Sequence, residues 1–418
     1  MRKMLRSMIL LVIILGSAVP EWSMVVAADP GDFAGGDGSA GNPYQIADWY
    51  HLDKVRDHLG DNFILLNDLD SLSYGYEGLA GTGADSERGW LPIGTVGSEF
   101  TGSLDGRGYE IRDLVIDRTD EDYVGLFGYV GSGGVIEDLG VAGASVTGNF
   151  GVGGLVGWCD SGTVSNCYAT GSVLGINYVG GLVGYHYSGT VSNCYATGSV
   201  LGMIFVGGLV GSCSGPVSNC CATGSVTGNF GVGGLVGLII SGTVSNCYST
   251  GSVTGDSDVG GLVGNYSSGT VSNCFWDTET SVVGSSPCGA GKTTAQMQDI
   301  ATFTDTSTTG LDSRWNMVAG APGVTYPYWT WNIVDGEDYP FLTFNRVQIK
   351  VSAGWNMVSV PAEFCGGSNT VENLFGDEIV AIYTWDPESK SYTAPTVLEP
   401  FRGYWIAVME DKTITLHV

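Results

Sequence analysis

The amino-acid sequence predicts an all-β protein whose middle is a right-handed parallel β-solenoid (β-helix) with coils of about 27 residues. Three observations support this fold class. A glycine-rich block recurs at a nearly constant interval, its residues favour strands and turns, and only 14% of the chain is charged. A turn-rich β protein has such a composition, whereas a disordered chain is charged and poor in apolar residues.

The repeat is visible in two short blocks. GGLVG begins at Gly153, Gly180, Gly207, Gly233 and Gly260. Ser-Asn-Cys begins at Ser165, Ser192, Ser218, Ser245 and Ser272. Copies of each block follow one another after 26 or 27 residues, and the short step falls where SCSGPVSN replaces YHYSGTVSN. A fixed period of this size is typical of solenoids, propellers and other repeat arrays.

A helical repeat is excluded by the composition of the unit, because glycine weakens a helix interior by about 1 kcal/mol each. The unit instead divides into short strand-like pieces between glycine corners, and three short strands fit one coil. Parallel strands of stacked coils lie about 4.8 Å apart. Six coils therefore give an array roughly 29 Å long, and right-handed crossovers are the rule for parallel strands.

Stacking turns each repeated position into a column. The asparagines can hydrogen-bond along the axis, as stacked asparagines do in cross-β structures, and the leucines and valines form core columns. The asparagine column comprises Asn166, Asn193, Asn219, Asn246 and Asn273. The leucine column comprises Leu155, Leu182, Leu209, Leu235 and Leu262, and the valine column Val164, Val191, Val217, Val244 and Val271.

Five of the ten cysteines also form a column: Cys167, Cys194, Cys220, Cys247 and Cys274. In-register side chains point the same way, which suits disulfides poorly, so we expect buried free thiols. Cys288 and Cys365 in the flanks are a candidate pair. Metal binding is not expected, because the chain has only four histidines and lacks a C-x-x-C pair. Calcium at Asp-rich loops is the one ion left open, and no other cofactor is predicted.

Aromatic residues follow the cysteine column by one position, at Tyr168, Tyr195, Tyr248 and Phe275, with Cys221 in the third place. Neighbours in a strand face opposite sides, so inward cysteines predict an outward aromatic stripe. Such a stripe is a candidate ligand-binding surface for a sugar ring or a partner protein. Two alternatives remain: the tyrosines point inward, or a flanking segment packs over the stripe.

The flanks divide the rest of the chain. Residues 1–28 read as a signal peptide, with a basic start, an apolar run over 8–19 and Val26-Ala27-Ala28 as a cleavage site. Residues 29–122 are predicted to be an N-terminal cap with the first coils, including a helix over 48–59. Residues 123–276 hold the repeats, 277–346 cap the other end, and 347–418 form a small β module whose aromatic residues supply its core. We therefore expect a secreted or cell-surface protein without a transmembrane segment after cleavage.

Charge argues against several function classes. The net charge of −27 repels nucleic acid. Polysaccharide hydrolases on β-helices need two carboxylates at a controlled separation, yet Val141–Phe275 contains no Lys, Arg or Glu. Acids in the first coils could still supply a site. Those acids are Asp68, Asp70, Asp105, Asp113 and Asp117.

The units GGLVG…GTVSNCYATGSVTG resemble the GLUG-motif repeats of bacterial and archaeal surface proteins. The lead-in GDGSAGNPYQIADWYHLDKVRDHLGDNFILLNDLD and the trailing WNIVDGEDYPFL are also similar, so the resemblance covers roughly residues 32–345. The segment GWNMVSVP…FRGYWIAV resembles a small module at the C-termini of exported proteins. Some GLUG proteins carry a metallopeptidase domain, but this chain has no H-E-x-x-H.

The resemblance implies a non-catalytic exported surface protein that serves as an adhesion or ligand-binding scaffold. A glycan or a cell-surface protein is the expected partner. The alternatives are a purely structural component of a surface layer or matrix, and a polysaccharide-active β-helix enzyme.

Overall fold

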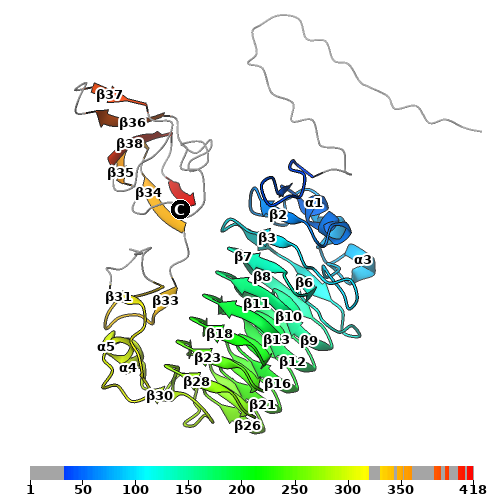
Figure 1. Ribbon diagram of the computed structural model, residues 1–418, viewed down its shortest axis with the longest axis vertical. Coiled ribbons are helices and arrows are strands. Elements are labelled where there is room, and N and C mark those ends of the chain that lie inside the picture. Colours follow the sequence, from blue (N-terminus) through cyan, green and yellow to red (C-terminus); the bar gives the residue numbers. More distant parts are fainter. Residues whose placement is uncertain are drawn as a thin grey trace, which may run out of the picture.

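The computed structural model describes residues 33–319, 330–342, 346–351, 353–359, 381–386, 391–394, 403–409 and 412–417. Its main body is a parallel β-solenoid built from three sheets of 13, 12 and 5 strands (Figure 1). Within the described parts of the chain, no helix is long and apolar enough to cross a membrane.

The 13-stranded sheet begins at the N-terminal end and runs the length of the stack. Its strands are β1 (Tyr44–Ile46), β2 (Asn62–Leu65), β3 (Ser103–Asp105), β6 (Phe127–Val130), β7 (Val135–Glu137), β10 (Val156–Ser165), β13 (Val183–Ser192), β17 (Val210–Cys213), β18 (Pro216–Ser218), β22 (Val236–Ile239), β23 (Thr243–Ser245), β27 (Val263–Tyr266) and β28 (Thr270–Ser272).

The other two sheets complete each coil. The 12-stranded sheet holds β4 (Glu110–Arg112), β5 (Val115–Asp117), β8 (Gly140–Thr147), β11 (Tyr168–Leu174), β14 (Tyr195–Ala196), β15 (Ser199–Leu201), β19 (Cys221–Ala222), β20 (Val226–Thr227), β24 (Tyr248–Ser249), β25 (Val253–Thr254), β29 (Phe275–Asp277) and β30 (Ala290–Lys292). The five-stranded sheet holds β9 (Phe150–Gly153), β12 (Asn177–Gly180), β16 (Ile204–Gly207), β21 (Phe230–Gly233) and β26 (Ser257–Gly260).

One coil visits each sheet once, as in β9, β10 and β11, and then begins again at β12. The predicted three strands per coil are thus found, with a refinement. The long strands β10 and β11 bend at register shifts near Asp160 and Gly171. In later coils these two strands are each replaced by two short ones, as in β17 with β18 and β14 with β15.

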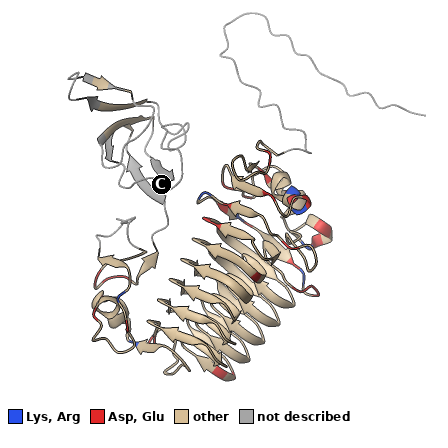
Figure 2. Cartoon of the chain, in the orientation of Figure 1, with Lys and Arg blue, Asp and Glu red and all other residues tan. Residues whose placement is uncertain are grey.

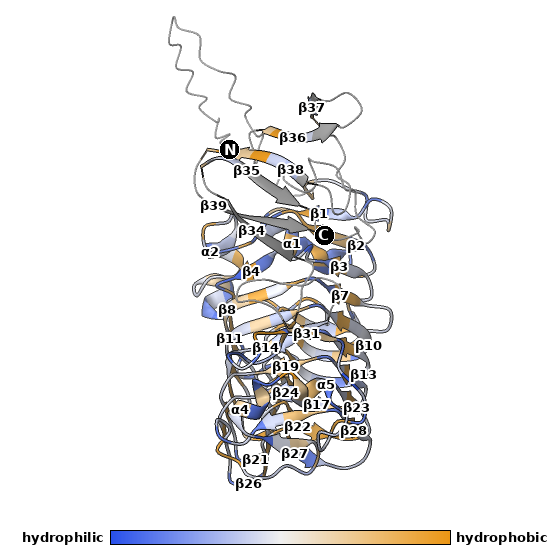
Figure 3. Ribbon diagram, turned by 90° about the vertical axis from the view of Figure 1, so that its left-hand side faces the viewer, coloured by the Kyte–Doolittle hydropathy of each residue, from blue (hydrophilic) through white to orange (hydrophobic). Residues whose placement is uncertain are grey.

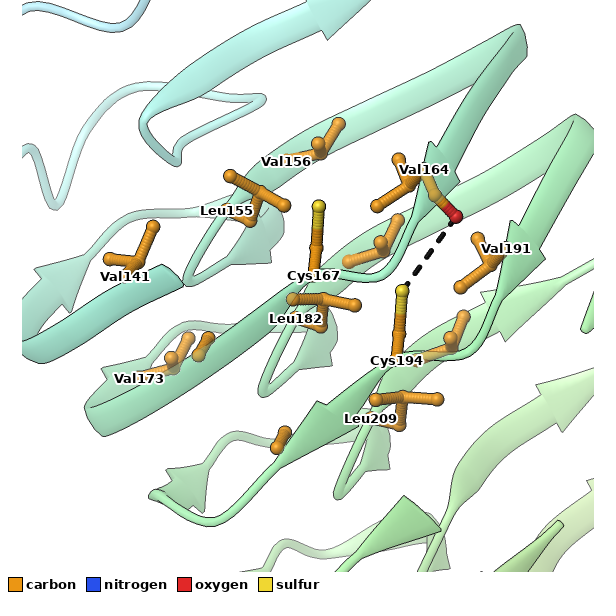
Figure 4. Packing of buried hydrophobic residues seen from close by; sticks show 14 of the residues in the cluster. Val141, Leu155, Val156, Val164, Cys167, Val173, Leu182, Val191, Cys194 and Leu209 are labelled. Carbon is orange, nitrogen blue, oxygen red and sulfur yellow. Dashed lines mark hydrogen bonds between the residues drawn. The ribbon is translucent and has the colours of Figure 1, made fainter. Parts of the chain in front are cut away.

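The columns predicted from the repeat are present in register. The valine column of Val164, Val191, Val217, Val244 and Val271 pairs in succession along the 13-stranded sheet. The leucine column is fully buried from Leu155 to Leu262. Figure 4 shows Leu155, Leu182 and Leu209, together with Cys167 and Cys194, pointing into the core from successive coils. A single coil could not bury its apolar face, but the stack can.

Each asparagine of the column sits at a tight corner with φ between 52° and 53°. Asparagine tolerates this left-handed conformation better than most residues. The Asn193 amide donates to the Asn166 Oδ1 at 3.1 Å, and equivalent bonds join Asn246 to Asn219 and Asn273 to Asn246. At the 26-residue step the Oδ1 of Asn193 has no partner, although the backbone N–H of Asn193 still donates to Ser218 O at 3.0 Å.

The cysteine column is buried and unbridged, as expected. Each thiol donates to the carbonyl oxygen two residues earlier, at 3.1 Å for Cys167, Cys194 and Cys220. Burial raises the pKa of the Cys167, Cys220 and Cys247 thiols well above the usual range. Cys288 is half-buried and free, and Cys365 lies outside the described residues.

The N-terminal end of the stack is closed by short elements. The edge of β1 pairs with residues 34–35 through two backbone bonds at Gln45, of 2.9 and 3.0 Å. The predicted helix is α1 (Trp49–Lys54), capped by Asp48 and followed by the 3-10 turn η1 (Val55–Asp57). The short helices α2 (Tyr76–Leu79) and α3 (Ala84–Glu87) precede β3.

The segment after the repeats first bonds to the last coil and then turns back along the stack. Ser281, Ser285 and Ser286 accept backbone N–H groups of the last coil, at 3.0 to 3.2 Å, and β30 pairs with β29. The rest turns back along one side of the stack (Figure 1). It contains α4 (Thr294–Met297), α5 (Ala301–Thr304), β31 (Met317–Ala319), β32 (Trp331–Ile333) and β33 (Phe341–Leu342). Thr293 and Gln296 form a capping box at the start of α4.

The C-terminal stretch contains two antiparallel sheets. Their strands are β34 (Arg346–Val351), β35 (Gly354–Ser359), β36 (Ala381–Asp386), β37 (Ser391–Thr393), β38 (Gly403–Val408) and β39 (Lys412–His417). Tyr404 and Ile406 are buried here. The expectation that the aromatic residues supply the core is wrong for Trp355 and Tyr392, which are each 56% exposed.

Candidate functional site

The predicted aromatic stripe exists as a column on the outside of the 12-stranded sheet. Tyr168, Tyr195, Cys221, Tyr248 and Phe275 pair in register, coil after coil. The adjoining cysteine column faces the core, so the stripe faces outward, as the alternation of strand side chains requires.

The expectation of an exposed stripe is nevertheless wrong for Tyr248 and Phe275, which are 2% and 0% exposed. The segment that turns back along the stack covers them. The Tyr248 hydroxyl donates to Pro340 O, and the rings of Trp315 and Trp331 lie 6.1 Å from Phe275 and 5.7 Å from Tyr248. An apolar stripe is energetically costly in water, and the chain's own segment removes it from water.

The two remaining rings, Tyr168 and Tyr195, are half-buried. They stack at 4.8 Å with an interplanar angle of 2°, and the Tyr168 hydroxyl donates to Glu110. Their faces cover each other, so this pair presents mainly ring edges to solvent. Ligand binding by the pair stays a prediction.

A second, larger group of outward aromatic side chains lies over the five-stranded sheet and the adjoining part of the 13-stranded sheet. We call it the aromatic face. It comprises Tyr123, Tyr129, Phe150, Trp158, Tyr178, Tyr185, Tyr187, Phe205 and Phe230, all at least partly exposed. The repeat does not reveal the aromatic face, because these rings occupy positions that differ between coils. A signal was present: Trp158 and Tyr185 stand at the same distance after GGLVG, and Tyr178 and Phe205 at the same distance before it.

Two columns interlock in the aromatic face. Tyr129, Trp158 and Tyr185 pair in register on β6, β10 and β13, and Trp158 stacks on Tyr185 at 4.2 Å and 10°. Tyr178 meets Tyr185 edge-on at 5.0 Å and 88°. Tyr178 also has a left-handed backbone, with φ 53°. Edge-to-face and stacked contacts of this kind fix ring orientations.

Polar groups border the aromatic face at Asp160. Its carboxylate accepts the Tyr129 hydroxyl and the Ser188 hydroxyl, each at 3.3 Å, and Ser161 and Ser188 share a hydrogen bond of 2.7 Å. Tyr187, 52% exposed, lies beside this network. Burial, together with the Asp160 charge, raises the pKa of Tyr129 to about 12. The hydroxyls therefore stay protonated and can donate hydrogen bonds at neutral pH.

The repeat array also contains one buried histidine, His186, which stands between Cys159 and Cys213 in register. Burial lowers its pKa to about 4, so the ring is neutral at physiological pH. Its Nε2 has no partner, and Nδ1 lies 4.0 Å from the Cys213 thiol. Among the residues that the structure describes, no three His, Cys, Asp or Glu side chains gather in a way that could hold a metal ion.

The acids of the first coils, considered above as possible catalytic groups, serve turns and ion pairs. Asp68 pairs with Arg112 at 3.0 Å, and Asp113 accepts the Ser71 hydroxyl at 2.7 Å. Asp105 accepts the Arg107 backbone N–H at 2.6 Å, and burial raises the pKa of Asp105. Asp70 is bonded to Ser73, which lowers its pKa.

Comparisons with known proteins agree with the repeat. The GLUG motif model matches residues 148–174, 175–201 and 228–254, each of which is one coil. A candidate Gly-rich membrane protein of Evansella cellulosilytica is 40% identical over 122 residues, which is 29% of this chain and 13% of that protein. Halomucin of Haloquadratum walsbyi is 36% identical over 144 residues, or 34% of this chain and 2% of halomucin. The chain thus spans a small part of both relatives.

A crystal structure of a candidate immunoglobulin A1 protease from Bacteroides ovatus has a similar fold. Its TM-score is 0.51 with 23% identity, and the match covers 63% of this chain and 86% of that one. At this identity the likeness concerns the fold. The chain thus contains GLUG-motif repeats, and each matched motif is one coil of its β-solenoid.

Proposed function

We propose that this chain is an exported, non-catalytic surface protein that binds a glycan through the aromatic face. The observation that carries the proposal is the group formed by Trp158, Tyr185 and Tyr187 beside Asp160 and its serines. Aromatic rings bury the apolar faces of sugars, while carboxylates and hydroxyls satisfy sugar hydroxyl groups. This group offers both within neighbouring coils.

The geometry favours a neutral glycan over an anionic polymer. The carboxylate of Asp160 accepts hydrogen bonds from Tyr129, Ser161 and Ser188, and the repeats from 141 to 275 carry no Lys or Arg. An anionic ligand would meet a negative chain without a compensating cation. Figure 2 illustrates how few charged residues lie on the repeat array.

The same residues support a binding role without catalysis. Hydrolysis of a glycosidic bond generally uses two carboxyl groups about 5 to 10 Å apart. Between residues 141 and 275 the other acids are Asp256 and Asp258, at least three coils from Asp160. The predicted export signal over 1–28 and the similarity to a Gly-rich membrane protein support a surface location.

The experiment is a glycan array with the exported form, residues 29–418, and a variant that combines Trp158→Ser, Tyr185→Ser and Tyr187→Ser. Serine is tolerated in this column, since Ser212 follows Tyr185 in register. We expect the wild type to bind a set of neutral glycans and the variant to lose at least about tenfold in affinity, a typical effect of removing buried aromatic anchors.

Tyr266→Ser is the matched control, because Tyr266 is an exposed tyrosine of the same sheet, 39% exposed, several coils away. It should leave binding unchanged. Absence of binding to any glycan, or equal binding by the triple variant, would contradict the proposal. Release of shortened products by the wild type would contradict the non-catalytic part and favour the enzyme alternative.

A further inference from the structure

One corner of the solenoid carries exposed aliphatic side chains on two adjacent coils. We call it the apolar ridge. It lies where the 12-stranded sheet meets the five-stranded sheet, between β11 and β12 and between β15 and β16. Its members are Leu174, Ile176, Leu201, Met203 and Ile204, which are 42%, 40%, 49%, 49% and 37% exposed.

The neighbouring coils act as an internal comparison, because they have the same backbone at this corner. The N–H groups of Ile176, Met203, Asn229 and Asp256 each donate to the equivalent residue of the preceding coil, at 2.9 to 3.1 Å. The corner therefore folds equally well with polar or apolar side chains. The coils on either side place Thr and Asn or Asp where the ridge has Leu, Ile and Met.

Two aligned columns make the pattern clear. Following the backbone pairing, the first reads Glu121, Asn149, Ile176, Met203, Asn229 and Asp256. The second reads Asp117, Thr147, Leu174, Leu201, Thr227 and Thr254. Both columns are close to palindromic about the same point, which lies midway between the two ridge coils. In each column the two central residues are apolar, the next residue on either side is small and polar, and the end residues are acidic or polar.

A palindromic surface is complementary to a second copy of itself. A two-fold axis through the midpoint, perpendicular to the solenoid axis, places each ridge coil opposite the other ridge coil of the partner, so Leu174 meets Leu201 and Ile176 meets Met203. Isologous interfaces of homodimers have this symmetry. In the third column the same axis relates Phe150 to Phe230 and Asn177 to Ile204, so this column matches in its outer pair and not at its centre.

We propose that the chain forms an antiparallel, side-by-side homodimer through the apolar ridge. Contiguous exposed apolar side chains mark interaction sites, and the ridge offers few hydrogen-bonding groups for a glycan. The ends of the two columns would bring Glu121 near Asp256 of the partner. This like-charge contact lies about 12 Å from the axis, so salt strengthens the dimer by screening it. The ridge is distinct from the glycan surface proposed above, and the proposal goes beyond it.

Sedimentation velocity of residues 29–418 tests the proposal. The wild type should dimerise at micromolar concentration, more tightly in 0.5 M than in 0.05 M NaCl. The variant that combines Leu174→Thr, Ile176→Asn, Leu201→Thr and Met203→Asn carries the residues of the neighbouring coils, and its dissociation constant should rise at least about 100-fold. An unchanged thermal midpoint would show that it still folds. Tyr187→Ser, an exposed aromatic residue outside the ridge, should leave the dimer intact.

Cross-linking tests the orientation. With Cys288 and Cys365 replaced by serine, Thr147→Cys and Thr227→Cys proteins should form a mixed disulfide when combined. Thr147→Cys alone should not, because its two copies would lie three coils apart, about 14 Å. A wild type that stays monomeric at 100 μM, a ridge variant that dimerises like the wild type, or efficient self-linking of Thr147→Cys would overturn the proposal.

Discussion

The second glycine of GGLVG is a position where a single added side-chain carbon should disturb the stack. At Gly208, an added Cβ would lie 2.2 Å from the Gly234 carbonyl oxygen of the next coil and 2.8 Å from the Ala222 Cβ. Carbon and carbonyl oxygen normally approach to about 3.3 Å. The two coils must therefore separate locally by about 1 Å, and neither contact atom is the end of a flexible side chain.

The loss of stability follows from this separation of the two coils. The N–H of Gly208 donates to Gly233 O at 3.2 Å and that of Leu209 to Leu235 O at 2.9 Å. Moving the strands apart by about 1 Å loses both bonds, about 1 kcal/mol each, and overpacking adds about 1 to 3 kcal/mol. Gly208→Ala should therefore lower the free energy of unfolding by about 3 to 5 kcal/mol.

Urea unfolding of residues 29–418, followed by circular dichroism, measures the effect. Gly284→Ala is the matched control, because an added Cβ there has no atom within 4 Å; it should change the free energy of unfolding by at most about 0.5 kcal/mol. Equal effects of the two substitutions would refute the reasoning that close approach of successive coils requires glycine in the repeat.

Two further predictions concern polar groups inside the stack. Asn246→Ala removes the bonds to Asn219 and from Asn273 at a corner with φ 53°, so it should lower the free energy of unfolding by about 2 to 4 kcal/mol. Asn246→Gly should cost about 1 kcal/mol less, because glycine accepts this φ. Equal urea midpoints of the two variants would contradict the role of the backbone. The pKa of His186 is lowered to about 4 by burial, so stability is lost as the pH falls from about 6.5 to about 4, where the unfolded chain binds the proton first. His186→Cys, the residue found at Cys159 and Cys213 in the same column, should flatten this part of the pH profile of the urea midpoint.

The sequence was sufficient to predict the coil, its period and its columns, because matching residues in a stacked repeat must lie over one another. It also predicted the inward cysteines and outward tyrosines, since alternation in a strand is a local property. It could not predict that Tyr248 and Phe275 are covered. Their burial depends on Trp315 and Trp331, which belong to a segment without a period, and nothing in the repeat specifies where such a segment packs.

The aromatic face and the apolar ridge could not be predicted from the repeat, because their residues differ from coil to coil. The repeat reveals only the positions that are the same in every coil. Figure 3 shows that apolar and hydrophilic residues are interspersed along the strands of the stack. In the structure, positions such as Leu155 and Gly208 are identical across coils because the stack requires them, whereas Trp158, Ile176 and Met203 differ from their counterparts while the backbone does not change.

This separation of roles explains how a chain of near-identical coils can have distinct surfaces. Stacking fixes the inward residues and leaves one or two outward positions per corner free in every coil. A change on a single coil adds one side chain, but the same kind of change on adjacent coils adds a patch that grows by about 4.8 Å per coil. The covered half of the aromatic stripe, Tyr248 and Phe275, is such a patch, and a later segment of the same chain packs over it. The aromatic face and the apolar ridge are built by the same rule on the other sides of the coil, which is why we assign them partners outside the chain.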